Sequence, residues 1–590
     1  MKKIVGLIGC AVTLLALSGC AAEYQKVVTF VEAEDPIGLT DAQKAEWDKL
    51  GENLNAAWAS TDFRYGRSVV PSSFGEEEVC RITAWKGERA SAQIVLWSAT
   101  AKDGVECAVS EFRSDNSVLP ADVAQARFVR YTLADQLTED FMQTNHYKRG
   151  STPAAIAPDM LDTLCRYDMP ARTVRPVWVS LEIPQDADAG IYKAVVTVSH
   201  NGRGKVKLPL EVEVVDHVLP SPDKWNYYLD LWQHPTSVAR AQGLEVWSDE
   251  HFEALVPVMK RLADAGQKVV TATLNKDPWN HQCYDGYAPM ILWTKHKDGS
   301  WSYDYTVFDR WVQLMLDLGI NRSINCYSMV PWNCELEYMD ETKGEIVTVK
   351  AEPGTPIFPE IWAPFLKDFK KHLEKKGWLS FTNIAMDERS PEAMKAAADV
   401  LMDNAPEMGF ALADNHASYK KFTMMRDVCV AMRQSVVSQE DIDQRREKGF
   451  YTTFYICCTP SFPNTFSLSD PYEAEMMGWY NVAYDYDGML RWAYNSWAED
   501  PQYDSRYGGW TSGDTYFVYP YNRSSIRFEK LIDGIEVAEK VRQLRREGVD
   551  TAPVEKVLEK IRSVNVTDYT QPWHEIIVEA RKALDEVSRK

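Results

Sequence analysis

The strongest constraint on the fold is a repeated alternation, after Trp225, of short apolar segments with longer amphipathic ones. The short segments have the length of buried strands, and the longer ones carry apolar residues at helical spacing. The predicted strands are residues 227–233, 268–274, 323–329, 381–386, 409–413, 428–432, 451–458 and 488–495. The clearest predicted helices are residues 252–265, 305–318, 362–376 and 391–404. Eight strands in this alternation predict a (β/α)8 TIM barrel.

The barrel region is longer than the ~250 residues of a plain barrel, so we expect long loops after some strands. We place the barrel domain at residues 225–525. Residues 526–590 are rich in Glu, Lys, Arg and Leu at helical spacing. We assign them to the closing barrel helix and a C-terminal helical extension.

Residues 25–216 show period-two alternation instead, at 81–85, 92–97, 173–183, 190–198 and 206–215. The last two segments flank Asn201-Gly202-Arg203-Gly204, which favours a hairpin turn. Short strands separated by turns predict an antiparallel β-sandwich. We interpret it as a supporting or glycan-contacting module, and Pro220 and Pro222 mark the linker at residues 216–223. The expected fold class is therefore multidomain, with an N-terminal sandwich followed by the barrel and its helical extension.

The first residues have the character of a targeting signal. Lys2 and Lys3 precede an apolar run at residues 4–17 that is too short to span a bilayer. Leu17-Ser18-Gly19-Cys20 resembles the bacterial lipoprotein signal, which implies removal of residues 1–19 and acylation of Cys20. The alternative is an ordinary secretory signal with a chance cysteine. We expect a lipid-anchored protein of the bacterial cell envelope at the outer membrane, with its face undetermined.

Charge and cysteine content exclude several function classes. A formal net charge of −21 argues against nucleic acid as a partner, since phosphate backbones are bound by clustered Lys and Arg. The cysteines show no zinc-type spacing and His is scarce, so we expect no metal and no cofactor. Cysteines in apolar strand-like runs are interpreted as packing residues, with a redox pair at the last two as the alternative: Cys326, Cys429, Cys457 and Cys458. The sequence indicates no oligomeric state.

In a barrel, functional side chains gather at the carboxyl ends of the strands. These ends are rich in carboxylates, amides and large aromatic rings, which suit a sugar because its C–H faces stack on rings and its hydroxyls need planar hydrogen-bond partners. The candidate substrate-binding residues are Trp232, His234, Asn275, Tyr455, Trp492 and Trp497, together with Trp510 and Asp514 from the glycine-containing loop at 508–514. The alternatives are core packing for the tryptophans, turn capping for Asn275 and a simple turn at 508–514. Asp230, on the first predicted strand, either lines the floor of the pocket or forms a structural pair with another side chain.

The candidate catalytic residues are Asp387 and Glu388, which directly follow an apolar predicted strand. Repulsion and partial burial of adjacent acids push their pKa values apart, leaving one ionised and one able to donate a proton. The alternative is an acidic helix cap at the start of the helix that follows.

Adjacency also limits the mechanism. Neighbouring acids are poorly placed on opposite faces of a sugar but well placed side by side on a 2-acetamido sugar. Glu388 would protonate the leaving oxygen while Asp387 holds the acetamido N–H. The acetamido carbonyl, hydrogen-bonded by Tyr455, would attack the anomeric carbon, and water would then open the oxazolinium ring with retention.

Several segments together resemble glycoside hydrolase family 123: Leu229-Asp-Leu-Trp-Gln-His-Pro235, Met386-Asp-Glu388, Phe454-Tyr455 and Gly488-Met-Leu-Arg-Trp492. The resemblance covers about residues 25–560 and implies a β-N-acetylgalactosaminidase acting on neutral glycans such as glycosphingolipid oligosaccharides. It carries the family's Asp and Glu over to Asp387 and Glu388, and Arg389 beside them is less expected. Two alternatives remain: a glycosidase for β-N-acetylglucosamine or a sugar without an acetamido group, and a non-catalytic lipoprotein that captures glycans.

Overall fold

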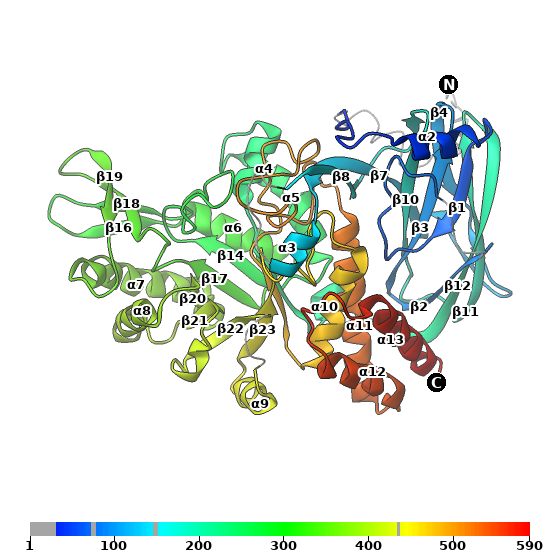
Figure 1. The fold of residues 1–590 in the computed structure, drawn as a ribbon. Coiled ribbons are helices and arrows are strands. Elements are labelled where there is room, and N and C mark those ends of the chain that lie inside the picture. Colours follow the sequence, from blue (N-terminus) through cyan, green and yellow to red (C-terminus); the bar gives the residue numbers. More distant parts are fainter. Residues whose placement is uncertain (1–30, 72–77, 145–151, 433–436) are drawn as a thin grey trace, which may run out of the picture.

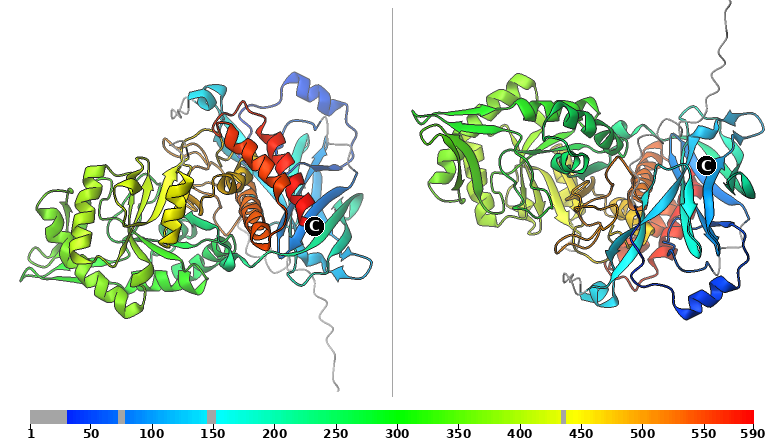
Figure 2. Two further views of the ribbon diagram at one scale, coloured as in Figure 1. Left: turned by 90° about the horizontal axis from the view of Figure 1, so that it is seen from below. Right: turned by 90° about the horizontal axis from the view of Figure 1, so that it is seen from above.

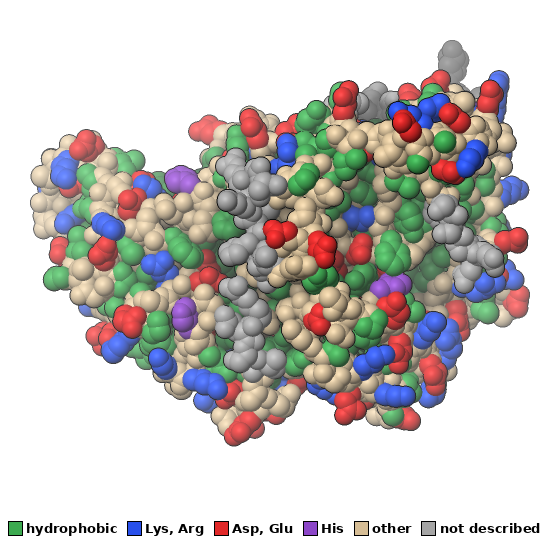
Figure 3. All heavy atoms as spheres, in the orientation of Figure 1, with side chains coloured by type: hydrophobic (Ala, Val, Ile, Leu, Met, Phe, Trp, Pro, Cys, Tyr) green, Lys and Arg blue, Asp and Glu red, His purple; other side chains and the backbone are tan. Residues whose placement is uncertain are grey.

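The computed structural model describes residues 31–71, 78–144, 152–432 and 437–590. A β-rich N-terminal part lies beside an eight-stranded parallel near-barrel, with the C-terminal helices between them (Figures 1 and 2). On the face drawn in Figure 3, acidic and basic side chains are interspersed.

The N-terminal part is a sandwich of two sheets. The first sheet has the order β1 (Asn55–Ala59), β3 (Arg89–Ser98), β10 (Thr173–Glu182), β7 (Ala124–Asp135) and β8 (Ala154–Leu161). The second has the order β2 (Cys80–Lys86), β12 (Arg203–Val218), β11 (Gly190–His200), β4 (Lys102–Val109) and β9 (Tyr167–Met169), with the short strands β5 (Phe112–Arg113) and β6 (Val118–Leu119) beside β11. The predicted hairpin is confirmed, because β11 and β12 pair antiparallel across Asn201 and Gly202, both at positive φ. Two small helices flank the sandwich, α2 (Asp41–Asp48) and α3 (Glu139–Thr144).

All eight strands predicted for the second part are present and parallel. Their spatial order is β13 (Tyr228–Leu231), β24 (Gly488–Arg491), β23 (Tyr451–Tyr455), β22 (Met425–Ala431), β21 (Gly409–Asp414), β20 (Thr382–Asp387), β17 (Ser323–Tyr327) and β14 (Val269–Thr273). The helices that follow in the chain are α4 (Pro235–Gln242), α5 (Asp249–Ala263), α6 (Thr306–Asp317), α7 (Ile357–Lys376), α8 (Pro391–Asn404), α9 (Gln439–Glu447), α10 (Pro471–Ala483) and α11 (Ile526–Glu547). The predicted start of α8 is confirmed, with Ser390 capping the backbone N–H of Ala393 and Pro391 in the first turn.

Two features differ from a regular strand–helix barrel. The segment between β21 and β22 contains the 3-10 turn η4 (Ser418–Lys420) instead of an α-helix. The sheet also closes without a full ladder, because an isolated bridge joins Leu229 of β13 to Gln267, which lies two residues before β14. Side-chain amides supply further bonds at this seam: Gln267 Oε1 accepts from the backbone N–H of Leu231 at 2.9 Å, and Gln233 Oε1 accepts from that of Thr271 at 2.8 Å.

Part of the expected long loops forms a further, four-stranded sheet. Its strands are β16 (Trp301–Asp304), β15 (Leu292–Lys295), β18 (Glu335–Asp340) and β19 (Glu345–Lys350), which follow β14 and β17 and project at the far left of Figure 1. The sequence analysis did not predict these strands. Most of their residues are partly or fully exposed, so these strands lack the continuous apolar runs that mark the barrel strands.

The sandwich holds a loop at the mouth of the near-barrel. The backbone of Leu133 on β7 donates to Tyr503 O at 2.9 Å and accepts from Ser505 N at 2.8 Å. Two residues on, Asp135 Oδ2 accepts from the backbone N–H and the hydroxyl of Ser512. These bonds fix the loop at residues 492–525, which follows β24.

The C-terminal helices α12 (Ala552–Ser563) and α13 (Trp573–Ser588) complete the contact between the two parts (Figure 2). Arg581 on α13 forms a buried ion-pair network with Asp62 of the sandwich and Glu475 of α10, at 2.6 Å and 2.5 Å. Lys530 of α11 pairs with the same Glu475. α10 and α11 approach closely enough that a Cβ on Gly478 would stand 1.8 Å from Gly534 O.

Replacing Arg581 by Ala is expected to lower the free energy of unfolding by up to about 3–5 kcal/mol, because the buried carboxylates of Asp62 and Glu475 lose a charged partner. Lys560→Ala is the matched control. Lys560 of α12 forms an exposed ion pair with Glu579 of α13, the helix that also carries Arg581. We expect that variant to lose less than ~1 kcal/mol. Urea unfolding followed by tryptophan fluorescence measures both. Equal losses would show that the buried network contributes no more than a surface pair.

Candidate active site

A cavity of about 130 Å3 lies at the carboxyl ends of the parallel strands. Its lining comes from residues at or just after the ends of five of the eight strands, and from the loops after β14, β17 and β24. The lining residues are Trp232, Gln282, Trp332, Asp387, Glu388, Ala413, Tyr455, Cys457, Cys458, Leu490, Trp492 and Trp510. Both candidate catalytic acids are among them.

Asp387 and Glu388 face one cavity because the backbone turns between them. Asp387 is the last residue of β20 and pairs with Ala413 of β21. The N–H of Glu388 extends this pairing by donating to Ala413 O at 2.9 Å, and Glu388 then adopts a left-handed conformation with φ of 47°. Strand neighbours otherwise point to opposite faces. A left-handed glutamate costs about 1–3 kcal/mol, and such strain collects at functional sites.

The pKa of Asp387 is raised to about 7, first by burial and then by the neighbouring charge of Glu388. The indole N–H of Trp332 opposes the shift by donating to Asp387 Oδ2 at 3.0 Å. The positive charge of Arg389 acts in the same direction as that hydrogen bond. Asp387 therefore changes charge near neutral pH.

Glu388 is held by Tyr455, at the end of β23, whose hydroxyl donates to Glu388 Oε1. Burial and the charge of Glu388 raise the pKa of Tyr455 well above its usual value, so the phenol stays protonated and remains a donor. This hydrogen bond joins Tyr455, at the end of β23, to Glu388, which follows β20, across the cavity mouth.

Tryptophans form much of the remaining wall. Trp232 packs between Trp279 and Tyr327, with both ring centroids 4.8 Å away. Trp492 and Trp510 meet edge to face, with centroids 5.1 Å apart. Trp510 comes from the loop that the sandwich holds, and its indole N–H donates to Gln282 O at 2.9 Å. Rings at several angles suit the apolar faces of a sugar.

Four of the eight predicted binding residues do not line the cavity. The amide of Asn275 donates to Glu337 O at 2.9 Å and accepts from the N–H groups of Lys276 and Glu337, so it anchors β18. His234 is fully buried and stacks on Tyr287 at 3.7 Å, and burial lowers its pKa to about 3. Neither side chain lines the cavity.

The other two lie behind the wall. Trp497 is 1% exposed and donates its indole N–H to Val518 O at 2.6 Å, so it belongs to the core. Asp514 is buried, pairs with Arg491 at 2.8 Å and accepts from the indole N–H of Trp492 at 3.2 Å. It orients Trp492 from behind.

The structure also bears on an inner-strand aspartate and on four cysteines. Asp230 is buried outside the cavity lining, and burial together with the charge of Asp427 raises its pKa well above its usual value. The packing prediction is confirmed for Cys326 and Cys429, which are buried. It is wrong for the partly exposed Cys457 and Cys458, which line the cavity with their sulfur atoms 3.9 Å apart.

Two further cavity residues, Trp332 and Gln282, were not among the predicted binding residues. Trp332 lies five residues after the end of β17, and Gln282 lies in the loop after β14. Trp332 was recognisable as an aromatic residue near a strand end, whereas nothing in the sequence marks Gln282.

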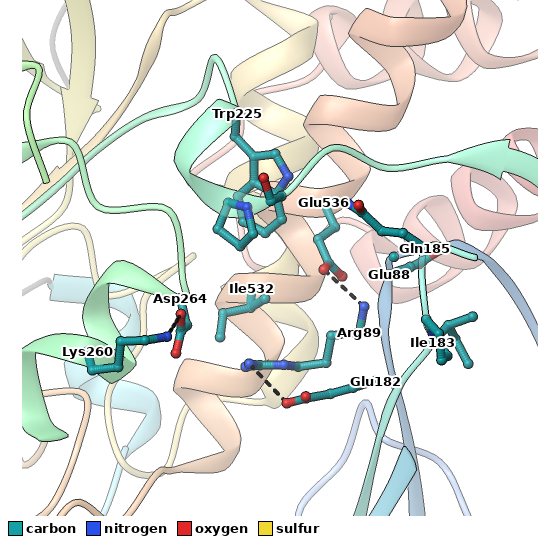
Figure 4. Close-up of a pocket in the computed structure, with 14 residues that line it drawn as sticks. Glu88, Arg89, Glu182, Ile183, Gln185, Trp225, Lys260, Asp264, Ile532 and Glu536 are labelled. Atoms are coloured by element: carbon teal, nitrogen blue, oxygen red, sulfur yellow. Dashed lines mark hydrogen bonds and ion pairs between the residues drawn. The ribbon is translucent and has the colours of Figure 1, made fainter. Parts of the chain in front are cut away.

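A larger cavity of about 460 Å3 lies between the sandwich and α11 (Figure 4). Its charged groups bind one another: Glu536 Oε1 accepts from the backbone N–H of Arg89 at 3.0 Å, and the Arg89 side chain lies 3.7 Å from Glu182. We assign this cavity to the domain interface. In the described part of the chain, no group of three or more His, Cys, Asp or Glu side chains is arranged to hold a metal ion.

Comparisons with known proteins bear on both parts of the chain. The family model described as Glycoside hydrolase 123, catalytic domain, matches residues 232–544, and the model described as Glycoside hydrolase 123 N-terminal domain matches residues 58–200. A search of curated proteins found no match.

Among solved structures, the chain is similar to a family 123 glycoside hydrolase from Clostridium perfringens, described in connection with glycolipid glycan hydrolysis. The two are 26% identical with a TM-score of 0.81, over 91% of this chain and 97% of that one. A GH5 xyloglucanase from Bacteroides ovatus matches at 11% identity over 82% of this chain and all of its own, with a TM-score of only 0.28. The family models cover more than half of the chain between them, and the chain belongs to glycoside hydrolase family 123.

Proposed function

We propose that this protein is a retaining exo-glycosidase that removes terminal β-N-acetylgalactosamine from neutral glycans of the glycosphingolipid type. Catalysis is substrate-assisted and passes through an oxazolinium intermediate. The proposal treats the near-barrel as a (β/α)8 barrel with its active site at the carboxyl ends of the strands.

The observation that carries the proposal is the position of the two acids. Asp387 and Glu388 lie side by side in one cavity, and the other lining residues in the described part of the chain include no carboxylate. Two-carboxylate glycosidases hold their acids ~5 Å or ~6.5–9.5 Å apart on either side of the bond. Adjacent residues at one strand end do not flank a sugar. We therefore infer that the nucleophile is the acetamido group of the substrate and not a carboxylate of the enzyme.

The two acids then have different roles. Glu388 protonates the glycosidic oxygen, and Asp387 in its ionised form accepts the acetamido N–H. The carbonyl oxygen attacks the anomeric carbon and the leaving group departs with the proton from Glu388. Water next attacks the oxazolinium ion, Glu388 accepts the proton of that water, and the configuration is retained.

Tyr455 changes its hydrogen-bond partner when the sugar binds. A phenol has one proton, so its hydroxyl donates either to Glu388, as in this structure, or to the acetamido carbonyl. Sugar binding transfers that hydrogen bond to the carbonyl.

The substrate class rests on the cavity wall, the net charge and the similarity to the clostridial enzyme. The tryptophan rings suit sugar faces, and the net charge of −21 disfavours sulfated or uronic-acid polymers. The clostridial enzyme's association with glycolipid glycans supports the assignment to this class.

We also propose that the protein is anchored to the cell envelope through acylated Cys20. This residue and the signal at 1–19 lie outside the described residues. Within the residues that the structure describes, we find no helix with the length and apolarity needed to cross a membrane. A tethered enzyme would meet its glycans at the membrane surface.

The function is tested with a pair of aryl β-glycosides that differ only at O4 of the 2-acetamido sugar. We expect hydrolysis of the N-acetylgalactosaminide at least ~10-fold faster than that of the gluco epimer. Proton NMR should show the β-anomer as the first product. Preference for the gluco epimer would correct the substrate, and first release of the α-anomer would contradict the retaining mechanism.

Glu388→Gln should lose about 10²–10⁴-fold in kcat on substrates with a sugar leaving group, because that leaving oxygen needs a proton. The loss should be much smaller with a 2,4-dinitrophenyl leaving group. Glu392→Gln is the matched control, since Glu392 is an exposed acid in the first turn of α8. Equal losses on both substrates would remove Glu388 from the role of general acid.

The acidic limb of the pH profile of kcat/KM should reflect the titration of Asp387. Because its carboxylate form binds the acetamido N–H and its pKa is about 7, activity falls as the pH decreases through this value. Glu388→Gln removes a neighbouring negative charge, so its limb should lie at lower pH. Rates from pH 4 to 9 with the dinitrophenyl substrate measure the shift, and a limb that stays in place would contradict this coupling.

A further inference from the structure

We propose that Cys457 and Cys458 form a two-thiol site that binds a trivalent arsenical in the wall of the active-site cavity, and that the bound arsenical excludes the sugar. The site uses neither of the two acids and binds its ligand through sulfur. The loss of activity rests on the proposed function, whereas the binding itself does not.

Both thiols reach the cavity. Cys457 and Cys458 line it and are partly exposed, unlike the buried Cys326 and Cys429. Strand β23 ends at Tyr455, and the chain bends at the two cysteines. Neighbouring side chains within a strand point to opposite faces, but this restriction does not hold beyond the end of the strand. A ligand in the cavity therefore has access to both sulfur atoms.

The distance between the thiols suits a bridging atom. The two sulfur atoms lie 3.9 Å apart. A tetrahedral zinc ion with Zn–S bonds of ~2.3 Å separates two sulfur ligands by ~3.8 Å. Arsenic–sulfur bonds are of similar length, so one arsenic atom can bridge the pair with little movement of the side chains. A disulfide fits less well, because it usually joins residues whose Cα atoms are ~4.4–6.8 Å apart, whereas neighbouring Cα atoms are only ~3.8 Å apart.

Hydrogen bonds hold the backbone of the pair. The N–H of Cys457 donates to Thr459 O at 3.2 Å, and the carbonyl of Cys457 accepts from the side-chain amide of Asn464 at 2.9 Å. Asn464 is fully buried, and its Oδ1 accepts from the guanidinium of Arg491 at 3.0 Å. The thiols are thus positioned before a ligand arrives, which lowers the entropic cost of binding through both sulfur atoms.

The number of ligand atoms determines which ligand fits. Structural zinc sites need four ligands. Among the described residues, no group of three or more His, Cys, Asp or Glu side chains is arranged for a metal ion. A trivalent arsenic atom with one organic substituent needs only two further bonds. Thiolates are soft ligands that select soft centres. Ligand number and softness therefore both favour an organoarsenical over zinc.

Binding is a ligand exchange without oxidation or reduction. Hydrated phenylarsine oxide carries two hydroxyl groups on arsenic. Two As–O bonds break, two As–S bonds form, and each thiol proton leaves with a hydroxide as water, so arsenic stays trivalent. The phenyl group then occupies a cavity of about 130 Å3 that Tyr455 and Trp492 also line. It competes with the sugar for this space.

The test titrates the reduced protein with phenylarsine oxide and measures both the intact mass and the hydrolysis of an aryl β-N-acetylgalactosaminide. We expect a single phenylarsenic adduct and a loss of activity that dithiothreitol reverses. An equal thiol concentration of 2-mercaptoethanol should not reverse it. Cys457→Ser and Cys458→Ser should each raise the concentration for half-inhibition by at least ~100-fold, because the second As–S bond forms intramolecularly. Each variant is compared with its own uninhibited rate.

Cys107→Ser is the matched control, because Cys107 is a partly exposed cysteine of β4 in the sandwich. It should leave the adduct and the inhibition unchanged. An adduct that persists in both Cys457→Ser and Cys458→Ser would overturn the site, and full activity of the arsenical-bound protein would overturn the exclusion of the sugar. Absence of hydrolysis before the arsenical is added would instead overturn the proposed function, and the mass measurement would still test the site.

Discussion

The site depends on one constraint: two adjacent acids must face one cavity. A regular strand would direct Asp387 and Glu388 to opposite sides. The left-handed backbone of Glu388 removes this difference, and the hydrogen bonds of Glu388 to Ala413 and Tyr455 hold it there. The resulting proximity of two carboxyl groups, together with burial, moves the pKa of Asp387 to about 7. Backbone geometry therefore sets both the direction of the side chains and their proton affinity.

The sandwich contributes to the site through the loop after β24. Leu133 and Asp135 of β7 bind Tyr503, Ser505 and Ser512, and the same loop carries Trp510 into the cavity wall. Trp510 in turn bonds to Gln282 from the loop after β14. The N-terminal domain is thus a supporting module, as one of its two sequence interpretations holds, and it acts on the loop rather than on the strands.

Much of the fold was predictable because buried parallel strands are continuous apolar runs. Segments such as 323–327 and 409–414 are short and fully buried, and their recurrence in alternation with helical segments predicts parallel strands. The projecting sheet β15–β19 was missed, since its half-exposed strands carry mixed residues. The segment between β21 and β22 is too short and polar for the regular helix that the repeat predicts.

The site was predictable where a residue directly ends a strand, as for Trp232, Tyr455 and the acidic pair. It was not predictable where a loop decides the direction of the side chain. Asn275 and His234 also follow strands, yet their side chains bond to β18 and Ser496 instead of facing the cavity. Gln282 enters from a loop whose path depends on contacts distant in sequence, such as its bond with Trp510, and no local pattern encodes those contacts.

The central claim concerns which atoms of the substrate the two acids contact. The most direct measurement is a crystal structure with a galacto-configured thiazoline, an analogue of the bicyclic intermediate in which sulfur replaces the ring oxygen. The account places a carboxylate oxygen of Asp387 within about 3 Å of the thiazoline nitrogen, with Glu388 beside the anomeric carbon. A complex in which that nitrogen faces another group, or in which both acids point away from the bound ring, would contradict it.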